Sequence, residues 1–130
     1  MHVAFLILAH VPYVRRAGRQ PIGEDALHTL VAQGLIPLIE LLGDLHAAGL
    51  GPRVALACSP LLTEQLVDPV VQKHFVLWMN DLLERRRAEL QAAEAAGDHH
   101  RVYLARFYLE WGRQRLHAFA DRYDRNLPKK

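Results

Sequence analysis

The sequence predicts an α/β fold in which one parallel βαβ unit is followed by a long helical hairpin. Two continuous apolar runs, Val3–Ala9 and Val54–Cys58, are typical of buried strands. Apolar residues at helical spacing separate these runs, and two strands joined by a helix form a right-handed parallel unit. The chain offers no third convincing strand, and two parallel strands do not make a stable sheet alone. We therefore expect the fold to be incomplete as it stands.

The first apolar run places a histidine at the end of a strand. Val3–Ala9 is partly β-branched or aromatic, which favours a strand buried on both faces. Pro12 cannot donate a hydrogen bond to a ladder, so the strand ends near that position. His10 then lies at the carboxyl end of the strand, the edge where parallel α/β folds bind their ligands.

A loop over residues 15–23 precedes the first helix, whose positive N-terminal end suits Glu24 and Asp25. Apolar residues keep helical spacing from there to Leu42. Pro37 falls inside this pattern, and we expect it to kink the helix or to start a second segment.

After the second strand, which we also expect to be buried, the sequence repeats one helix-start signal. Ser59-Pro60 and Asp68-Pro69 each combine an N-cap residue with a proline suited to the first turn. They predict a short helix over residues 61–67 and then a much longer one. Gly97-Asp98 predicts a turn, with Asp98 as the N-cap of a last helix that ends near Pro128.

Composition limits the class of protein. The 130 residues are 51% hydrophobic, and 16 basic against 14 acidic residues give a net charge of +2, too balanced to indicate a nucleic-acid partner. The single Cys58 excludes an internal disulfide framework and fits a reducing compartment, so we expect a cytoplasmic protein. No unbroken apolar run reaches about 18 residues, so we expect no membrane span.

Five segments, in order, resemble glycoside hydrolase family 57, and specifically its 1,4-α-glucan branching enzymes. The segments are Leu8-Ala9-His10-Val11-Pro12-Tyr13-Val14, Gly34-Leu35-Ile36-Pro37-Leu38-Ile39, Leu56-Ala57-Cys58-Ser59-Pro60-Leu61-Leu62, Asp68-Pro69-Val70-Val71-Gln72-Lys73-His74-Phe75 and Phe107-Tyr108-Leu109-Glu110-Trp111. The resemblance covers nearly the whole chain and places it in the N-terminal portion of these enzymes.

The resemblance implies the start of a (β/α)7 barrel, with about residues 1–60 as the βαβ unit and about residues 61–126 as a helical insertion. It implies a retaining enzyme that cleaves an α-1,4 bond in a glucan such as glycogen or amylose and transfers the piece to a 6-hydroxyl. The Glu nucleophile and Asp acid/base of the family lie on later strands, so we assign no catalytic residue in this chain. We expect no cofactor and no metal, and a fragment that is inactive alone.

Two departures from the family pattern bear on specificity. Leu8 replaces the first histidine of the family motif and cannot hydrogen-bond a sugar. A Trp-Leu-x-Glu pattern on the first helix is replaced by Ala26-Leu27-His28-Thr29.

His10 and Tyr13 are the candidate substrate-binding residues. An imidazole can donate from one nitrogen and accept at the other, which suits vicinal hydroxyls; the alternative is a buried histidine satisfied by backbone. The Tyr13 ring would stack on a pyranose or donate its hydroxyl, or else would plug the loop against the barrel rim.

Other residues favour structural roles. Trp78 and Trp111 would suit glucose as flat platforms, but their helical spacing favours core packing. For Asp98-His99-His100 a surface turn is favoured over a metal site, and for Glu84-Arg85-Arg86-Arg87 a solvated helix face over a nucleic-acid patch. For Cys58 a small buried core residue is favoured over a nucleophile activated by the following helix.

Two functions therefore stand beside each other. The first is the opening part of an α-glucan-acting barrel, with the remainder of the barrel or a second copy covering the open sheet. The second is a carbohydrate-binding or protein-interaction module derived from that fold. A small nucleotide-binding protein is a weaker idea, because no glycine-rich phosphate loop follows the first strand.

Overall fold

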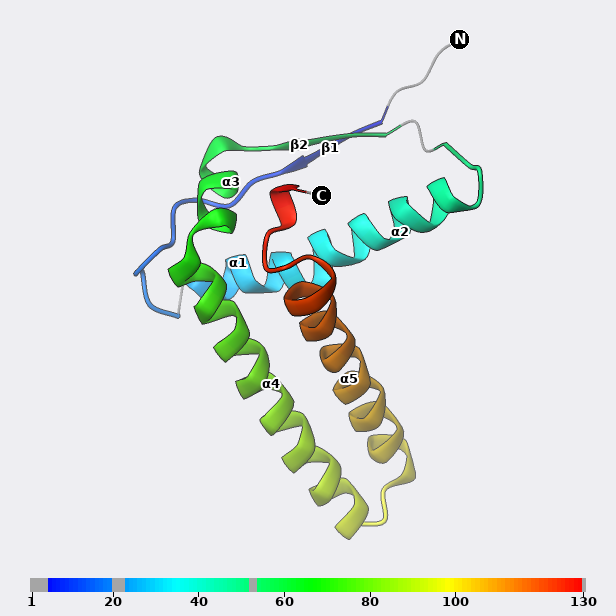
Figure 1. The fold of residues 1–130 in the computed structure, drawn as a ribbon. Helices are drawn as coiled ribbons and strands as arrows, with labels where there is room; N and C mark the ends of the chain where they lie inside the picture. The colour runs from blue at the N-terminus through cyan, green and yellow to red at the C-terminus, as the bar shows by residue number, and fades with distance from the viewer. Residues whose placement is uncertain (1–4, 20–22, 52–53, 130) are drawn as a thin grey trace.

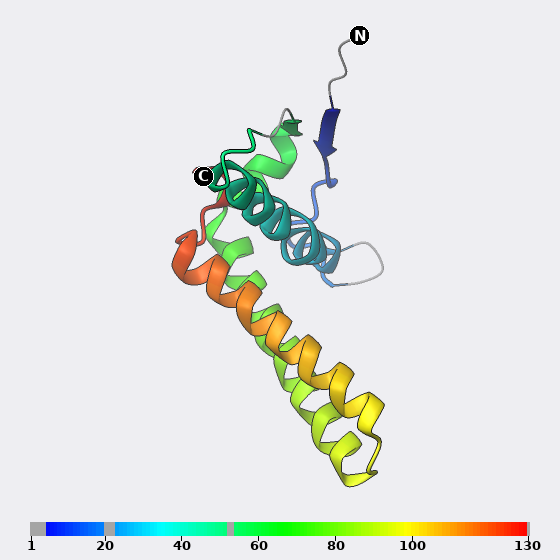
Figure 2. The same cartoon turned by 90° about the vertical axis from the view of Figure 1, so that its right-hand side faces the viewer.

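A computed structural model describes residues 5–19, 23–51 and 54–129 (Figure 1). The elements are β1 (Phe5–Ala9), α1 (Glu24–Leu30), a π-helical turn (Val31–Leu35), α2 (Ile36–Ala47), β2 (Val54–Cys58), α3 (Pro60–Val67), α4 (Pro69–Ala95), α5 (His99–His117), a second π-helical turn (Ala118–Arg122) and a short 3-10 turn (Leu127–Lys129). Figures 1 and 2 both show α4 and α5 as a hairpin that stands out from the body of the molecule.

The predicted parallel βαβ unit is confirmed. β1 and β2 pair in parallel, with Phe5 opposite Val54 and Ala9 opposite Cys58. α1 and α2 supply the crossover between them. The carboxyl ends of both strands therefore meet at one edge of the sheet, next to the start of α3.

The predicted burial of the strands is wrong for the residues that the structure describes. In β1 only Ala9 is buried, while Leu8 is 71% exposed, and Val54 and Leu56 in β2 are also exposed. The apolar runs have the composition of strands covered on both faces, but two strands leave the outer faces and edges without cover. The two strands therefore form as predicted, and only the expected cover on their faces is absent from the described residues.

Pro37 changes the first long helix as predicted. The Ile36 N–H donates to the Val31 carbonyl, five residues back, which makes the π turn between α1 and α2. Pro37, which has no N–H, then stands in the first turn of α2. The wider turn accommodates the proline without ending the helical run.

The three predicted N-caps are confirmed by their hydrogen bonds. Ser59 Oγ accepts from the Leu62 N–H at 3.2 Å at the start of α3. Asp68 Oδ1 accepts from the Val70 N–H at 2.8 Å, and Asp98 Oδ1 from the Arg101 N–H at 3.0 Å. Each cap satisfies a backbone donor that the first helical turn leaves free, so these starts are fixed by local chemistry.

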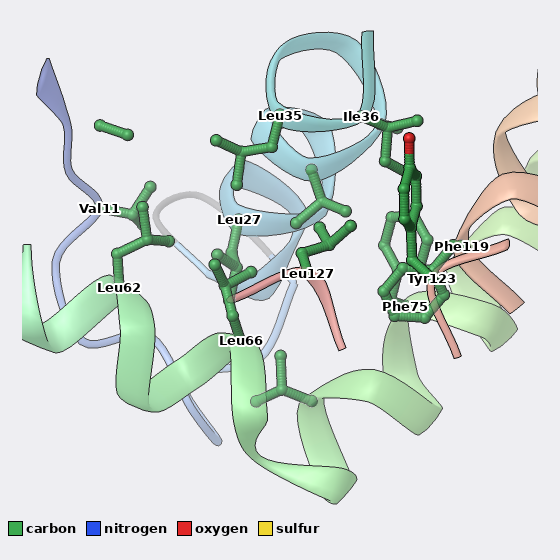
Figure 3. Packing of buried hydrophobic residues seen from close by; sticks show 14 of the residues in the cluster. Val11, Leu27, Leu35, Ile36, Leu62, Leu66, Phe75, Phe119, Tyr123 and Leu127 are labelled. Carbon is green, nitrogen blue, oxygen red and sulfur yellow. The ribbon is translucent and has the colours of Figure 1, made fainter. Parts of the chain in front are cut away.

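The hydrophobic core lies where α1, α3 and the first turns of α4 meet the end of the chain (Figure 3). The Phe75 and Phe119 rings pack with centroids 4.4 Å apart, and Leu27 is fully buried in the same core. Along α4 the buried positions include Met79 and Leu83. Trp78, for which core packing was expected, lies one residue before Met79, packs against the core and remains half-buried.

The helical run Glu24–Ala47 is long and apolar enough to cross a membrane by length and composition alone. Core helices of soluble proteins pass the same test, and this one contributes Leu27, Leu35 and Ile36 to the core. The expectation that no segment spans a membrane therefore stays a prediction.

Substitution of Gly23, just before α1, tests the packing of the loop, and substitution of Gly43 in α2 is the comparison. A Cβ on Gly23 would lie 2.2 Å from the Gly18 carbonyl oxygen, which accepts the Glu24 N–H at 2.8 Å. We expect Gly23→Ala to lower the free energy of unfolding by about 1–3 kcal/mol, because backbone atoms have to move. In the helix interior of α2, Gly43 has open space around it, so Gly43→Ala should stabilise by about 0.5–1 kcal/mol. Urea unfolding of both variants checks this pair, and equal effects would contradict the packing of the loop.

Candidate functional site

His10 lies at the carboxyl edge of the two strands. The Ser59 N–H continues the ladder by donating to the Ala9 carbonyl at 3.0 Å, so the residues that follow β1 and β2 stand side by side. His10 Nδ1 and Ser59 Oγ are 2.9 Å apart and share a hydrogen bond. The ring is exposed at this rim and not buried in the core.

The hydrogen bonds of Ser59 indicate which nitrogen of His10 faces a ligand. Ser59 Oγ accepts the Leu62 N–H and also bonds His10 Nδ1, so it caps α3 and orients the imidazole ring at the same time. Because Nδ1 is engaged by the serine, Nε2 is the ring nitrogen that remains for a ligand. An imidazole nitrogen donates or accepts according to its tautomer, and either role suits a sugar hydroxyl.

The segment after His10 is anchored by two valines and leaves Tyr13 outside. Val11 and Val14 are buried in the core, whereas Tyr13 is 57% exposed. The exposed Tyr13 ring is open to a ligand or to a further part of the protein, such as the barrel rim. His10 and Tyr13 are thus both exposed on a segment that the two valines anchor.

Gln65 fixes that backbone, and no sequence pattern indicated this role. The side chain, in α3, is 1% exposed. Its Oε1 accepts the Val14 N–H at 2.7 Å, and its Nε2 donates to the carbonyls of Pro12 and Leu61 at 3.2 Å each. Gln65 therefore holds the His10–Val14 segment from a point more than 50 residues further along the chain.

A second polar cluster surrounds Glu24. From the sequence, this residue was expected only to favour the positive N-terminal end of a helix. Glu24 is buried, its Oε1 accepts the Arg16 N–H at 2.9 Å, and its Oε2 lies 2.6 Å from His74 Nδ1. The carboxylate thus ties the loop after β1 to α4. Its position just inside the helix N-terminus is also electrostatically favourable.

His28 lies next to this carboxylate but remains neutral. Its ring is 2% exposed and packs edge-on against Phe75, with centroids 5.7 Å apart. Burial lowers the pKa of His28 to about 4, although Glu24, with its Oε2 3.8 Å from His28 Nε2, opposes the shift. A neutral imidazole is the form that an apolar pocket favours.

A pocket of about 420 Å³ opens beside Glu24, His28 and His74, with Trp78 also in its wall. His10 and Tyr13 are not among the residues that line it. The structure therefore separates the predicted strand-edge residues from the buried pair of Glu24 and His28.

Two further sequence interpretations are settled by placement. Cys58 is exposed, so the expectation of a buried core residue is wrong, because the part of the chain that the structure describes has no third strand to cover β2. The Glu84–Arg87 run lies on a solvated helix face, where Arg87 pairs with Glu84 and Arg86 with Glu89. Within residues 5–19, 23–51 and 54–129, no group of three His, Cys, Asp or Glu side chains is placed to hold a metal ion.

Curated relatives match most of this chain. The 1,4-alpha-glucan branching enzyme of Thermococcus kodakarensis is 27% identical over 113 residues, which are 85% of this chain and 17% of that enzyme. A probable 1,4-alpha-glucan branching enzyme of Mycobacterium tuberculosis is 29% identical over 87 residues, 67% of this chain and 15% of that protein. The chain thus spans less than a fifth of the length of these relatives, and no family model matches it.

Solved structures agree with the curated relatives. A GH57-type branching enzyme from Pyrococcus horikoshii superposes with a TM-score of 0.87 at 26% identity, covering 95% of this chain and 23% of that one. A GH57 branching enzyme from Thermococcus kodakaraensis, in complex with glucose and additives, gives a TM-score of 0.83 at 22% identity, covering 95% of this chain and 22% of that one. The resemblance to the N-terminal part of these enzymes is confirmed, and the fold is the start of a (β/α)7 barrel.

The clamp by Gln65 predicts a large effect of a nearly isosteric substitution. Gln65→Leu leaves the Val14 N–H and the Pro12 carbonyl without their partner, so unfolding should become easier by about 1–3 kcal/mol. Gln33→Leu on the exposed side of the first π turn is the matched control and should change stability by less than about 0.5 kcal/mol. Urea unfolding compares the two variants, and equal losses would show that Gln65 does not hold the segment.

The neutral state of His28 predicts a dependence of stability on pH. The unfolded chain, with an ordinary His pKa of about 6.5, binds a proton that the folded chain takes up only near pH 4. Stability should therefore fall, by up to about 3 kcal/mol, as pH drops from about 6.5 to about 4. His28→Phe keeps an aromatic ring against Phe75 and should flatten this part of the profile in urea unfolding. An unchanged slope in the variant would assign the dependence to other groups.

Proposed function

We infer that this chain forms the N-terminal portion of the catalytic barrel of a 1,4-α-glucan branching enzyme of glycoside hydrolase family 57. The observation that carries the inference is the agreement of two comparisons, 27% identity over 85% of the chain and a TM-score of 0.87 over 95% of it. The substrates we propose are α-glucans such as glycogen and amylose. A place in glycogen synthesis in the cytoplasm is part of the same proposal.

His10 and Tyr13 are proposed to line the substrate cleft at the rim of the barrel. The Nε2 of His10 is left free by the hydrogen bond of Nδ1 to Ser59, and Tyr13 is exposed three residues further on. Hydrogen-bonding groups of this kind on a rigid backbone orient sugar hydroxyls at low entropic cost. Leu8 stands at the position of the first histidine of the family motif. Its side chain provides no hydrogen bond, so the site has fewer polar contacts than the motif would supply.

The reacting acids are proposed to come from the part of the barrel that the longer relatives contain in addition. A retaining mechanism needs two carboxyl groups about 5–5.5 Å apart across the scissile bond. The buried carboxylate described here, Glu24, is instead engaged by the Arg16 N–H and by His74. Glu24 therefore positions the loop after β1 and is not assigned to the reaction.

The open sheet supports the proposal that more of the barrel covers it. Phe5, Leu6 and Leu8 are exposed on β1, and an apolar hollow of about 600 Å³ lies between α2 and β2. Burying surfaces of this kind is the main driving force for association. Further strands of the same polypeptide are the proposed cover, with a second copy of the chain as the alternative.

The activity is tested by the iodine spectrum of amylose, which shifts when branches form. The complete polypeptide that carries this chain should shift the spectrum, whereas residues 1–130 alone should not. Branching by residues 1–130 alone would show that the reacting carboxylates lie within these residues, contrary to the proposal. A complete polypeptide that binds glucan without any transfer would favour the binding module.

His10→Ala tests the strand-edge site directly. Removal of one hydrogen bond to a sugar hydroxyl should weaken maltooligosaccharide binding at the reacting site, seen as KM in the branching assay, about three- to tenfold. His99→Ala, on the exposed first turn of α5, is the matched control and should leave KM unchanged. Unchanged kinetics for His10→Ala would remove His10 from the cleft.

A further inference from the structure

We propose that one face of the α4–α5 hairpin is an accessory groove for a linear α-glucan chain, separate from the strand-edge site of His10. The choice of ligand rests on the proposed function, but the groove itself is defined by the hairpin together with α1, the loop before it and the first π turn. Its walls include Trp78, Tyr108 and Trp111, of which the two tryptophans were expected to be core residues.

Three hollows follow one another along this face. The first is the pocket of about 420 Å³ beside Glu24, and its wall includes Trp78. Trp78 also lines the second, of about 390 Å³, together with Tyr108 and Trp111. Arg86 and Tyr108 are shared between the second hollow and a third of about 260 Å³. The shared walls make the hollows neighbours along the hairpin, and the proposed groove is this row of three hollows.

The groove has the length of an extended ligand. On α4 it is lined at steps of three or four residues by His74, Trp78, Leu82, Arg86 and Glu89. This spacing keeps the residues on one face of the helix. At a rise of 1.5 Å per residue, the lined stretch is about 22 Å long. A linear oligosaccharide matches such a groove better than a compact ligand does.

The aromatic rings are held in place before any ligand arrives. Phe75 stacks behind Trp78 with centroids 6.2 Å apart, so one side of that ring is supported by the core. The Arg86 guanidinium lies 5.3 Å from the Tyr108 centroid, and Arg115 lies 5.9 Å from that of Trp111. Rigid aromatic rings with polar neighbours offer apolar contact to the C–H faces of glucose at little cost in side-chain entropy.

The charges along the groove favour a neutral ligand. Its walls contain four arginines and four carboxylates, so the formal charges cancel. Arg86 is paired with Glu89 at 2.6 Å, and Arg19 with Asp81 at 3.1 Å. A nucleic acid needs an excess of cations to replace its counterions. A glucan needs hydroxyl partners and aromatic faces, and the groove supplies both.

Tyr108→Ala tests the groove in the full chain by calorimetric titration with maltoheptaose. Tyr108 is 46% exposed, so its removal should leave the fold intact while weakening binding about tenfold, as expected for an aromatic contact residue. Tyr103→Ala is the matched control, since Tyr103 lies on the same helix, is 66% exposed and does not line the groove. Its affinity should equal that of the unmodified chain.

Two further measurements secure the result. Both tryptophans of the chain line the groove, so maltoheptaose should change the tryptophan fluorescence of the chain. Gln33→Ala changes an exposed groove residue on another helix and should also weaken binding, which covers the case of a Tyr108 variant that unfolds.

The outcomes separate the groove from the proposed function. If Tyr108→Ala and Gln33→Ala bind maltoheptaose as tightly as the unmodified chain does, the proposed groove is wrong, even where branching occurs. The same holds if the chain binds heparin in place of maltoheptaose. If the two variants lose affinity while no branching is found, the groove stands and the proposed function fails. Loss of affinity with branching retained supports both.

Discussion

The parallel pairing of β1 with β2 is the constraint on which the rest of the structure depends. Its register puts Ala9 opposite Cys58, and the Ser59 N–H extends the ladder by one further bond to the Ala9 carbonyl. His10 and Ser59 are neighbours for that reason alone. The same pairing starts α3 beside the first strand, where Gln65 can reach the segment that follows His10.

Features that depend on local chemistry were predicted from the sequence, and features that depend on distant partners were not. The caps at Ser59 and Asp68 and the break at Pro37 follow from the residues themselves and their immediate neighbours. Gln65 bonds Val14 across 51 residues, and His74 meets Glu24 across 50, so no local pattern announces either contact. Burial of the strands was mispredicted because it depends on neighbours that two strands cannot supply.

The candidate site divides in the same way. The position of His10 at the strand edge followed from an apolar run and a proline, while the orientation of its ring, with Nδ1 toward Ser59, is known only from the structure. Helical periodicity does not distinguish the two roles of Trp78 and Trp111. Each ring is half-buried, so it packs against the core on one side and lines a hollow at the surface on the other. In the proposal above, the hairpin both packs against the core and offers a surface to a polysaccharide, separate from the strand edge at which His10 lies.

A crystal structure of the complete polypeptide soaked with a maltooligosaccharide would show both the cover of the open sheet and the ligand of His10. We predict further parallel strands beside β1 and β2, and a glucose hydroxyl within hydrogen-bond distance of His10 Nε2. A sheet completed by a second copy of the chain, with the His10 rim covered and no sugar bound there, would contradict it.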